Sequence, residues 1–299
     1  MIKMKKYDLI IIGGGPAGVT AAVCAKRGGL SALTVEKTAI GGAAALTDKI
    51  ENFPPFLSIS GYDLAQKFSE YKSGCETVLR EVTEIKEKSD GFSVMTDNES
   101  YTAKAVILAG GVRRKRLIAE NEEKFAGKGV SYCALCDGAF FKGKKVAVAG
   151  GGNTALSEAI YLSEICEKVY LIHRRNEFRA QKYLTEKAKL CPNIEIIKPN
   201  EIKSIWGDKR VEGIALTDRE ISLDGVFAAI GTEPQSDILK GFVDLSKDGF
   251  VIANEECKTS RKGVFCAGDL RQKAVRQIVT AVSDGAVAAY FAEQYIHGI

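Results

Sequence analysis

Two segments of the chain share the same order of apolar and glycine-rich positions. In each, a short apolar run is followed by a cluster of glycines, an alanine-rich stretch and a second apolar run. The first segment begins with YDLIII at 7–12 and the second with KKVAVA at 144–149. Short apolar runs bounded by glycine predict buried parallel strands, and the stretches between them predict helices. The repeat therefore predicts two strand–turn–helix–strand units in an α/β chain.

The glycine clusters have the spacing of a dinucleotide-binding turn. The first cluster is GGGPAG at 13–18, and GGGNTA at 150–155 repeats it with alanine in the last position. In such turns Gly13 permits the sharp bend, Gly15 lets the backbone approach a pyrophosphate, and Gly18 lets the helix pack closely on the strand. The start of the following helix offers backbone N–H groups to phosphate. We therefore predict two Rossmann-like nucleotide-binding domains.

The residue that ends the second strand differs between the two segments. Glu36 ends the first and His173 the second, each 23 positions after the first glycine of its segment. A carboxylate accepts hydrogen bonds from a ribose diol and repels a phosphate, so the first site is predicted to bind FAD or NAD. Arg174 and Arg175 follow His173, with Arg179 four positions later. Guanidinium groups suit the 2′-phosphate of NADP, so the second site is predicted to bind NADP.

Composition limits the class of protein. The chain has 299 residues, 45% of them hydrophobic, with 42 basic and 38 acidic side chains and a net charge of +4. This balance does not favour binding to nucleic acid or to a membrane surface. No apolar run reaches the roughly 18 residues of a membrane span, and the N-terminal apolar run is too short for a signal peptide. We expect a cytoplasmic protein of about two domains.

The chemistry is indicated by SYCALCDG at 131–138. Of eight cysteines only Cys133 and Cys136 are closely spaced, and Asp137 follows directly; the other six are expected to be buried thiols. The pair could be half of a zinc site, a structural disulfide, two core thiols or a redox pair. Zinc is disfavoured because no second CxxC exists and the two histidines are far apart in sequence. Beside two nucleotide sites, the pair favours a relay from NADPH through a flavin to a disulfide, which needs no metal.

One later segment is predicted to belong to the first site. GVFCAGDL at 263–270 predicts an apolar strand that ends at Asp269, and residues 275–296 predict a long helix. In open α/β sheets, ligands bind at the carboxyl ends of the strands. Asp269 is therefore predicted either to contact the cofactor or to cap the helix that follows.

Together these segments resemble the low-molecular-weight, bacterial-type thioredoxin reductases over essentially the whole chain. The matching stretches are GGGPAG, IENFP at 50–54, GKGVSYCALCDG at 127–138, VAVAGGGNTALSEAIYLS, LIHRRNEFRAQK, AIGTEP at 229–234 and GVFCAGDLRQKAVRQIVTAVSDGAVAA. The resemblance implies an FAD domain formed by 1–112 and 243–299, with an NADPH domain at 113–242 inserted into it. It also implies a homodimer that reduces thioredoxin, or a thioredoxin-like protein, with electrons from NADPH.

The resemblance also implies roles for single residues. Cys136 would face the flavin, Cys133 would attack the disulfide of the partner, and Asp137 would serve the thiols as general acid and base. The implied FAD contacts are Gly13, Gly14, Gly15, Pro16, Ala17, Gly18, Glu36, Gly41, Gly42, Asn52, Val82, Asp269, Arg276, Gln277 and Ile278. The implied NADPH contacts are Gly151, Gly152, Asn153, Thr154, His173, Arg174, Arg175, Arg179, Ile230 and Gly231.

The sequence departs from the family pattern at four positions. Ala43 stands where the family usually has glutamine, Gly110 where it has threonine, Pro55 where it has glycine, and Leu135 where it has threonine or valine. None of these changes removes a chemical group of the relay. Two other functions are considered: a reductase driven by ferredoxin, and a flavin-bound redox sensor without turnover. The basic cluster after the second strand argues against the first, and the acid after the CxxC argues against the second.

Overall fold

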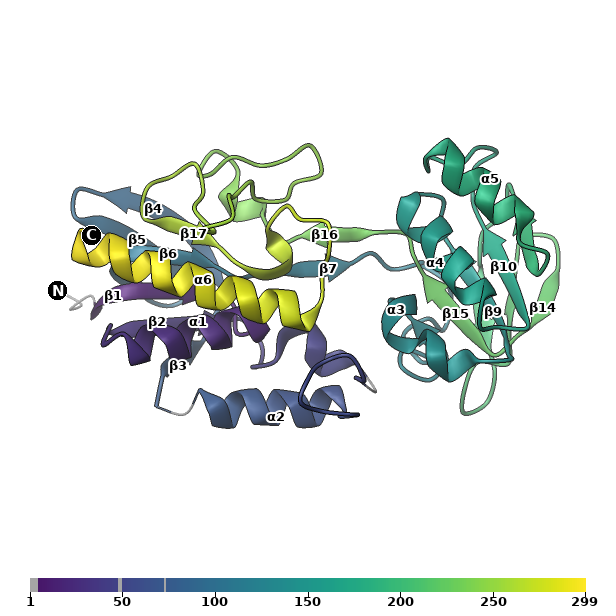
Figure 1. Cartoon of the computed structure of the whole chain (residues 1–299), viewed down its shortest axis with the longest axis horizontal. Helices are drawn as coiled ribbons and strands as arrows, with labels where there is room; N and C mark the ends of the chain where they lie inside the picture. The colour runs from purple at the N-terminus through teal and green to yellow at the C-terminus, as the bar shows by residue number, and fades with distance from the viewer. Residues whose placement is uncertain (1–4, 48–49, 73) are drawn as a thin grey trace. The chain divides into compact units, whose positions relative to one another are not determined.

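The computed structural model describes residues 5–47, 50–72 and 74–299, and the chain divides into two compact units (Figure 1). The first unit comprises Met1–Asp48, Phe53–Arg113 and Glu233–Ile299, and the second comprises Lys49–Asn52 and Arg114–Thr232. The first unit is thus built from segments that precede and follow most of the second unit in the sequence. Residues 233–242, which the resemblance placed with the NADPH domain, lie in the first unit.

A seven-stranded sheet forms the centre of the first unit. The strand order is β3-β2-β1-β6-β5-β4, and β17 also pairs with β6. Strands β3, β2, β1, β6 and β17 run parallel to one another. Strands β4 and β5 complete the sheet, and β5 pairs antiparallel with both β4 and β6. The bounds are β1 Lys5–Ile12, β2 Ala32–Glu36, β3 Glu76–Leu79, β4 Val82–Lys88, β5 Gly91–Thr96, β6 Ser100–Leu108 and β17 Val264–Cys266.

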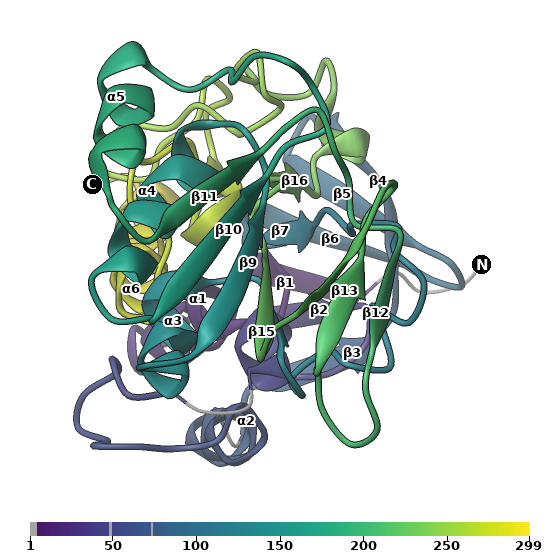
Figure 2. The ribbon, with the colours of Figure 1, turned by 90° about the vertical axis from the view of Figure 1, so that its right-hand side faces the viewer.

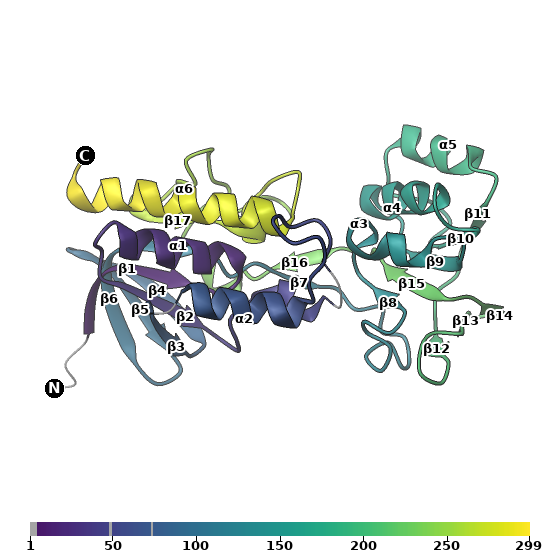
Figure 3. The ribbon, with the colours of Figure 1, turned by 60° about the horizontal axis from the view of Figure 1, so that its bottom comes forward.

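Two helices pack side by side on one face of the parallel strands (Figure 3). They are α1 (Pro16–Arg27) and α6 (Ile278–His297). Their close approach requires small residues, since a Cβ on Gly285 would lie 2.2 Å from the carbonyl oxygen of Ala17. A third helix, α2 (Gly61–Tyr71), is capped by Ser60, whose Oγ accepts a hydrogen bond from the backbone N–H of Asp63. The 3₁₀ turns of this unit are η1 Gly42–Leu46, η3 Asp237–Leu239 and η4 Gly268–Leu270.

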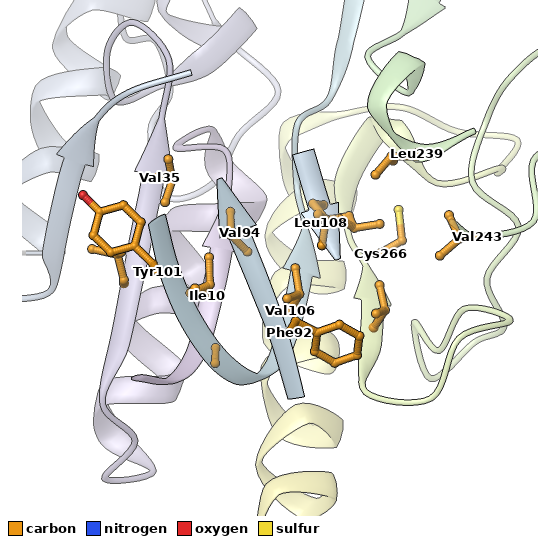
Figure 4. Close-up of a cluster of buried hydrophobic side chains, with 14 of the residues drawn as sticks. Ile10, Val35, Phe92, Val94, Tyr101, Val106, Leu108, Leu239, Val243 and Cys266 are labelled. Carbon is orange, nitrogen blue, oxygen red and sulfur yellow. The ribbon is translucent and has the colours of Figure 1, made fainter. Parts of the chain in front are cut away.

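The other face of this sheet carries a second apolar core. Figure 4 shows Ile10 and Val106 of the parallel strands, Phe92 of β5, and Leu239 and Val243 from the C-terminal segment in one cluster. All five side chains are buried. Burial of each such side chain stabilises the fold by about 1.5–3 kcal/mol. The core therefore joins segments that are far apart in the sequence.

The second unit has a related arrangement (Figure 2). Its parallel sheet has the order β11-β10-β9-β15-β8, and a three-stranded antiparallel sheet has the order β12-β13-β14. Helices cover one face of the parallel sheet and the antiparallel sheet packs against the other. The strands are β8 Val130–Ser131, β9 Lys145–Ala149, β10 Lys168–Ile172, β11 Ile194–Ile197, β12 Ser204–Trp206, β13 Gly213–Ala215, β14 Glu220–Ser222 and β15 Gly225–Ala228. The helices are α3 Ala134–Asp137, α4 Asn153–Ser163 and α5 Lys182–Leu190, with the 3₁₀ turn η2 Gly138–Phe141.

Two short strands, β7 (Val112–Arg114) and β16 (Thr232–Pro234), form a separate two-stranded sheet. Their ranges fall where the chain leaves the first unit and where it returns to it.

The predicted repeat is confirmed, because β1-α1-β2 and β9-α4-β10 are both parallel strand–helix–strand units joined by a glycine turn. The strand predicted at 263–270 is shorter than expected. It ends at Cys266 because Gly268 adopts a positive φ of 75° and the chain turns into η4. The following helix is capped by Gln277, so the alternative that Asp269 caps it is wrong. Within the ranges that the structure describes, no helix combines the length and the apolar character needed to cross a bilayer.

Candidate functional site

The first glycine turn lies at the carboxyl ends of β1 and β6. Gly13 has a φ of 112°, and a Cβ there would lie 2.3 Å from the carbonyl oxygen of Ala109. A Cβ on Gly18 would lie 1.9 Å from the carbonyl oxygen of Gly13. Both positions therefore exclude a side chain. Helix α1 begins at Pro16 with Gly15 as its N-cap and no side-chain cap, so its first N–H groups are available to an anion.

Glu36 is buried at the end of β2, and the turn holds its carboxylate. Oε2 accepts a 2.6 Å hydrogen bond from Gly14 N, and Oε1 accepts bonds of 2.8 and 3.1 Å from Thr38 N and Oγ1. Gly42 lies against Gly15, since a Cβ on Gly42 would be 3.0 Å from Gly15 Cα. Two glycines face each other beside an uncapped helix start, with an anchored carboxylate next to them. This arrangement fits the diphosphate and ribose of FAD.

Three other predicted FAD contacts are placed as follows. Gly41 donates a 2.9 Å hydrogen bond to Gly14 O and so belongs to the same turn. Val82 begins β4, two residues after Arg80, whose N–H donates to the carbonyl oxygen of Glu36 at 2.8 Å. Asn52, in contrast, falls in the segment 49–52, which clusters with the second unit. The structure therefore does not group Asn52 with the rest of this set.

Asp269 and the residues at the start of α6 are brought together. Asp269 lies in η4 directly after β17, and Arg276 Nε donates a 3.2 Å hydrogen bond to the carbonyl oxygen of Asp269. The guanidinium group of Arg276 lies over the ring of Phe250, 4.0 Å from its centroid. Burial lowers the pKa of Arg276, and the charge of Asp269 opposes this shift. With Gln277 as N-cap and Ile278 as the first helical residue, this segment has a fixed conformation.

A buried ionic network, which the sequence analysis missed, anchors the same segment. Lys273 Nζ lies 2.9 Å from Asp284 Oδ2 and 4.0 Å from Asp269 Oδ1, and the side chain of Lys273 is 9% exposed. Asp284 Oδ2 also accepts a 3.0 Å hydrogen bond from Gly268 N, and Arg271 Nη1 lies 3.8 Å from Asp284 Oδ1. No local sequence motif links Lys273 to Asp284. They are neighbours only because the segment that follows η4 packs against α6.

The second glycine turn shares these backbone constraints. Gly150 has a φ of 155°, and a Cβ there would lie 2.4 Å from the carbonyl oxygen of Ala229. A Cβ on Gly151 would lie 2.3 Å from the ring of His173. On Gly152, the N-cap of α4, a Cβ would meet nothing within 4 Å. The space before the start of α4 is therefore open to a ligand.

His173 is buried beside this turn. Its Nε2 lies 3.0 Å from the carbonyl oxygen of Glu177, and its ring stacks on Phe178 at 5.4 Å. A carbonyl oxygen only accepts, so Nε2 must carry the hydrogen of this bond. Burial lowers the pKa of His173, and the three nearby arginines lower it further, against the opposing effect of the Glu177 bond. The neutral ring acts here as a packing group.

The three arginines Arg174, Arg175 and Arg179 are exposed, and among the described residues none of them forms an ion pair. The backbone N–H of Arg179 donates a 2.7 Å hydrogen bond to Gly151 O, which places this basic segment beside the glycine turn. The remaining predicted NADPH contacts lie at the same edge: Asn153 and Thr154 begin α4, and Ile230 and Gly231 follow β15, which pairs with β9. Exposed positive charge beside a helix start fits a nucleotide with an additional phosphate.

Cys133 and Cys136 form a disulfide in the second unit, with their Cα atoms 5.3 Å apart. Both residues are partly exposed, and α3 begins directly after Cys133 and ends at Asp137. Burial raises the pKa of both Cys166 and Cys257 to about 11, which makes these thiols unreactive. Of the six remaining cysteines, Cys166, Cys257 and Cys266 are buried as expected, whereas Cys24, Cys75 and Cys191 are partly exposed. In the part of the chain that the structure describes, no group of three or more histidine, cysteine and acidic side chains could hold a metal ion.

The loop of the disulfide has two anchors that the sequence analysis missed. Ser131 Oγ donates a 2.6 Å hydrogen bond to Asp137 Oδ2 and accepts a 3.1 Å bond from Cys133 N. Tyr132 OH donates a 3.0 Å bond to Oε1 of the buried Glu122. A serine two positions before a CxxC only weakly predicts an anchor of the disulfide loop, because a serine hydroxyl commonly bonds to nearby backbone. The loop is thus held by side-chain hydrogen bonds of the two residues that precede Cys133.

Comparison with known proteins agrees with this geometry. The chain matches the pyridine nucleotide-disulphide oxidoreductase family over residues 7–285. It is 39% identical to thioredoxin reductase of Bacillus subtilis over 305 residues, which is 99% of this chain and 96% of that protein. It is similar to a crystal structure of thioredoxin reductase from Streptococcus pyogenes, with a TM-score of 0.94, 38% identity and 98% and 99% of the two chains covered.

A solved ferredoxin-flavin thioredoxin reductase from Clostridium acetobutylicum is also similar. It is 34% identical, with 99% and 100% of the two chains covered and a TM-score of 0.55. The glycine turns, the disulfide and the family match point to the same conclusion. The chain belongs to the pyridine nucleotide-disulphide oxidoreductases and, within them, to the thioredoxin reductases.

Proposed function

We propose that this protein is a cytoplasmic homodimer that transfers electrons from NADPH to thioredoxin, or to a thioredoxin-like protein, with FAD as its flavin. One observation carries most of this proposal. The partly exposed Cys133–Cys136 disulfide, with Asp137 directly after it, lies in the same unit as a glycine turn flanked by free guanidinium groups. A redox-active disulfide and a site suited to NADPH in the same chain are what a pyridine nucleotide-dependent disulfide reductase requires.

The two cofactors are assigned to the two units. FAD would be held by the turn at Gly13–Gly18, by Glu36 and by the segment from Asp269 to Ile278. NADPH would be held by Gly151–Thr154 and by the arginines that follow His173. When bound, FAD supplies the redox chemistry that connects a hydride donor with a dithiol.

The thiol chemistry belongs to the chain itself. In the reduced protein, the Cys133 thiolate would attack one sulfur of the partner's disulfide, and the other partner sulfur would leave as a thiolate that takes up a proton. Cys136 would then attack the sulfur of Cys133, which releases the second partner thiol and restores the Cys133–Cys136 disulfide. Two electrons and two protons pass to the partner. Asp137 would donate and accept protons as thiols and thiolates interconvert.

A ferredoxin-driven reductase is the second candidate, because a solved protein of that name is similar over nearly the whole chain. Two anaerobic titrations separate the candidates. NADPH should bleach the flavin absorbance of the purified holoenzyme, and oxidised thioredoxin should then restore it. Bleaching by reduced ferredoxin but not by NADPH would establish the alternative. Bleaching by NADPH that no oxidised thioredoxin reverses would indicate the redox sensor.

The two cysteines are distinguished by single substitutions. If Cys136 is the residue beside the flavin, Cys133→Ser should show a new long-wavelength absorbance from the remaining thiolate, and Cys136→Ser should not. Both variants should still be reduced by NADPH and should fail to reduce thioredoxin. Identical spectra for the two variants would show that the assignment of their roles is wrong.

A further inference from the structure

Ser131 and Asp137 both lie in the SYCALCDG stretch, but the sequence analysis gave Ser131 no role, and the pair forms one of the shortest side-chain contacts of the second unit. Ser131 is 5% exposed and ends strand β8, where it pairs with Phe227 of β15. Its Oγ donates to Asp137 Oδ2 at 2.6 Å, and this donor–acceptor distance is typical of a hydroxyl bound to a carboxylate. The hydroxyl is thus fixed by a strand, while Asp137 ends the short helix that carries Cys136.

The hydroxyl of Ser131 has three possible partners around it. It accepts a 3.1 Å hydrogen bond from Cys133 N, and its single hydrogen can reach Asp137 Oδ2 at 2.6 Å or the carbonyl oxygen of Cys133 at 3.5 Å. The shorter distance decides that the hydrogen lies toward the carboxylate when Asp137 is ionised. When Asp137 is protonated, the acid can donate to Ser131 Oγ, and the hydroxyl hydrogen can turn toward the Cys133 carbonyl.

This geometry matters because an acid that serves two thiols alternates between its two protonation states. A backbone N–H can only donate to the carboxyl group, and a carbonyl oxygen can only accept from its protonated form. A hydroxyl both donates and accepts, so it can hold either form without moving its oxygen. We propose that Ser131 is a positioning residue for Asp137, which keeps the carboxyl group beside the disulfide in both protonation states. The proposal rests on the role of Asp137 in the proposed function.

The test is a double-mutant cycle with the FAD-loaded protein. Turnover is followed as NADPH oxidation at saturating oxidised thioredoxin in the wild type, Ser131→Ala, Asp137→Asn and the double variant. A charge-assisted hydrogen bond to an acid that itself contributes about 10²–10⁴-fold predicts that Ser131→Ala lowers kcat about tenfold. The rate at which NADPH reduces the flavin should change less than about twofold, since that reaction does not involve Asp137.

The turnover of the double variant distinguishes a role of Ser131 through Asp137 from a purely structural role. If Ser131 acts through Asp137, the double variant should turn over no more than about twofold slower than Asp137→Asn alone. A purely structural loss, through the Cys133 N–H for example, would multiply the two effects and overturn the proposal. Ser163→Ala is the matched control, because Ser163 Oγ donates a 2.7 Å bond to the Ile160 carbonyl in the same unit. This control should keep wild-type kcat.

Other outcomes are also decisive. If Asp137→Asn is slow and Ser131→Ala is as fast as the wild type, the proposal fails and the proposed function stands. If Asp137→Asn itself turns over at the wild-type rate, the role of Asp137 in the proposed function is wrong and the proposal falls with it. Should Ser131→Ala fold poorly, as judged by its melting temperature, Ser131→Gly removes the same hydroxyl and carries the same prediction.

Discussion

The buried ion pair between Lys273 and Asp284 allows a quantitative test of how the segment of Asp269 is held. The perturbation is Lys273→Met, which keeps most of the length of the side chain and removes the charged amino group. Lys273 and Asp284 are 9% and 13% exposed, so the remaining carboxylate would be largely shielded from water. Breaking a buried pair in this way costs about 3–5 kcal/mol. Because Arg271 Nη1 remains 3.8 Å from Asp284, we expect the lower value, about 3 kcal/mol.

The assay is thermal unfolding of the FAD-loaded protein. For domains of about 150–250 residues, 1 kcal/mol shifts the melting temperature by about 2–4 °C, so Lys273→Met should melt about 6–12 °C below the wild type. Lys67→Met is the matched control in the same unit. Its pair with Glu70 has an N–O distance of 3.3 Å, but the side chains are 57% and 67% exposed. Exposed pairs contribute about 0–1 kcal/mol, so this control should melt close to the wild type.

A second substitution tests the cause. Asp284→Asn keeps an oxygen that can accept from Gly268 N and removes the negative charge. In the Lys273→Met background it should restore at least half of the lost melting temperature, because no unpaired buried carboxylate remains. The reasoning is refuted if Lys273→Met melts within about 1 °C of Lys67→Met. It is also refuted if the second substitution lowers the melting temperature further.

Three other predictions follow from the two nucleotide sites. Replacing both Arg174 and Arg175 with alanine should raise the KM for NADPH at least about tenfold and leave that for NADH nearly unchanged in steady-state assays. Folding lowers the pKa of His173 from its usual value of about 6.5. As the pH falls below that value, the unfolded chain therefore binds a proton at His173 more readily than the folded chain does. The unfolding free energy, measured with urea, should therefore fall as the pH drops from about 6.5, and His173→Asn should lessen this slope. Gly18→Ala would place a Cβ 1.9 Å from the Gly13 carbonyl oxygen, so it should weaken FAD binding in a flavin fluorescence titration, and an unchanged dissociation constant would contradict the close packing.

The sequence predicted those parts of the fold whose causes are local. Apolar runs and glycines at fixed spacing determine β1, α1 and β2, and the same pattern recurs from β9 to β10. The end of the strand after Val264 was less predictable, because the positive φ of Gly268 interrupts an apolar run that would otherwise continue. The capping role of Gln277 was also hidden, since it depends on a reciprocal bond with Thr280. Glycine and capping residues allow several local conformations, and the fold selects one.

The candidate site shows the same limit. Glu36 and Arg174 were found because they occupy fixed positions after a glycine turn. Ser131, Lys273 and Asp284 were missed because their importance depends on what they contact. The importance of Ser131 is recognisable only in the structure, where the helix after Cys133 brings Asp137 within hydrogen-bond distance of its hydroxyl. Sequence spacing therefore predicts candidate ligand-binding groups more readily than it predicts the groups that hold such residues in place.

The two glycine turns indicate how one scaffold serves two cofactors. Their backbones are constrained almost equally, since a Cβ on Gly13 or Gly150 would lie 2.3 or 2.4 Å from the carbonyl oxygen of the residue that follows the neighbouring strand. The glycines therefore cannot determine which nucleotide binds. The difference lies at the end of the second strand, where Glu36 presents a carboxylate tied to backbone N–H groups and His173 presents a packed ring followed by exposed guanidinium groups. A 2′-phosphate would be repelled at the first position and attracted at the second. We therefore propose that charge at this one position of a repeated fold decides which turn accepts the 2′-phosphate of NADPH.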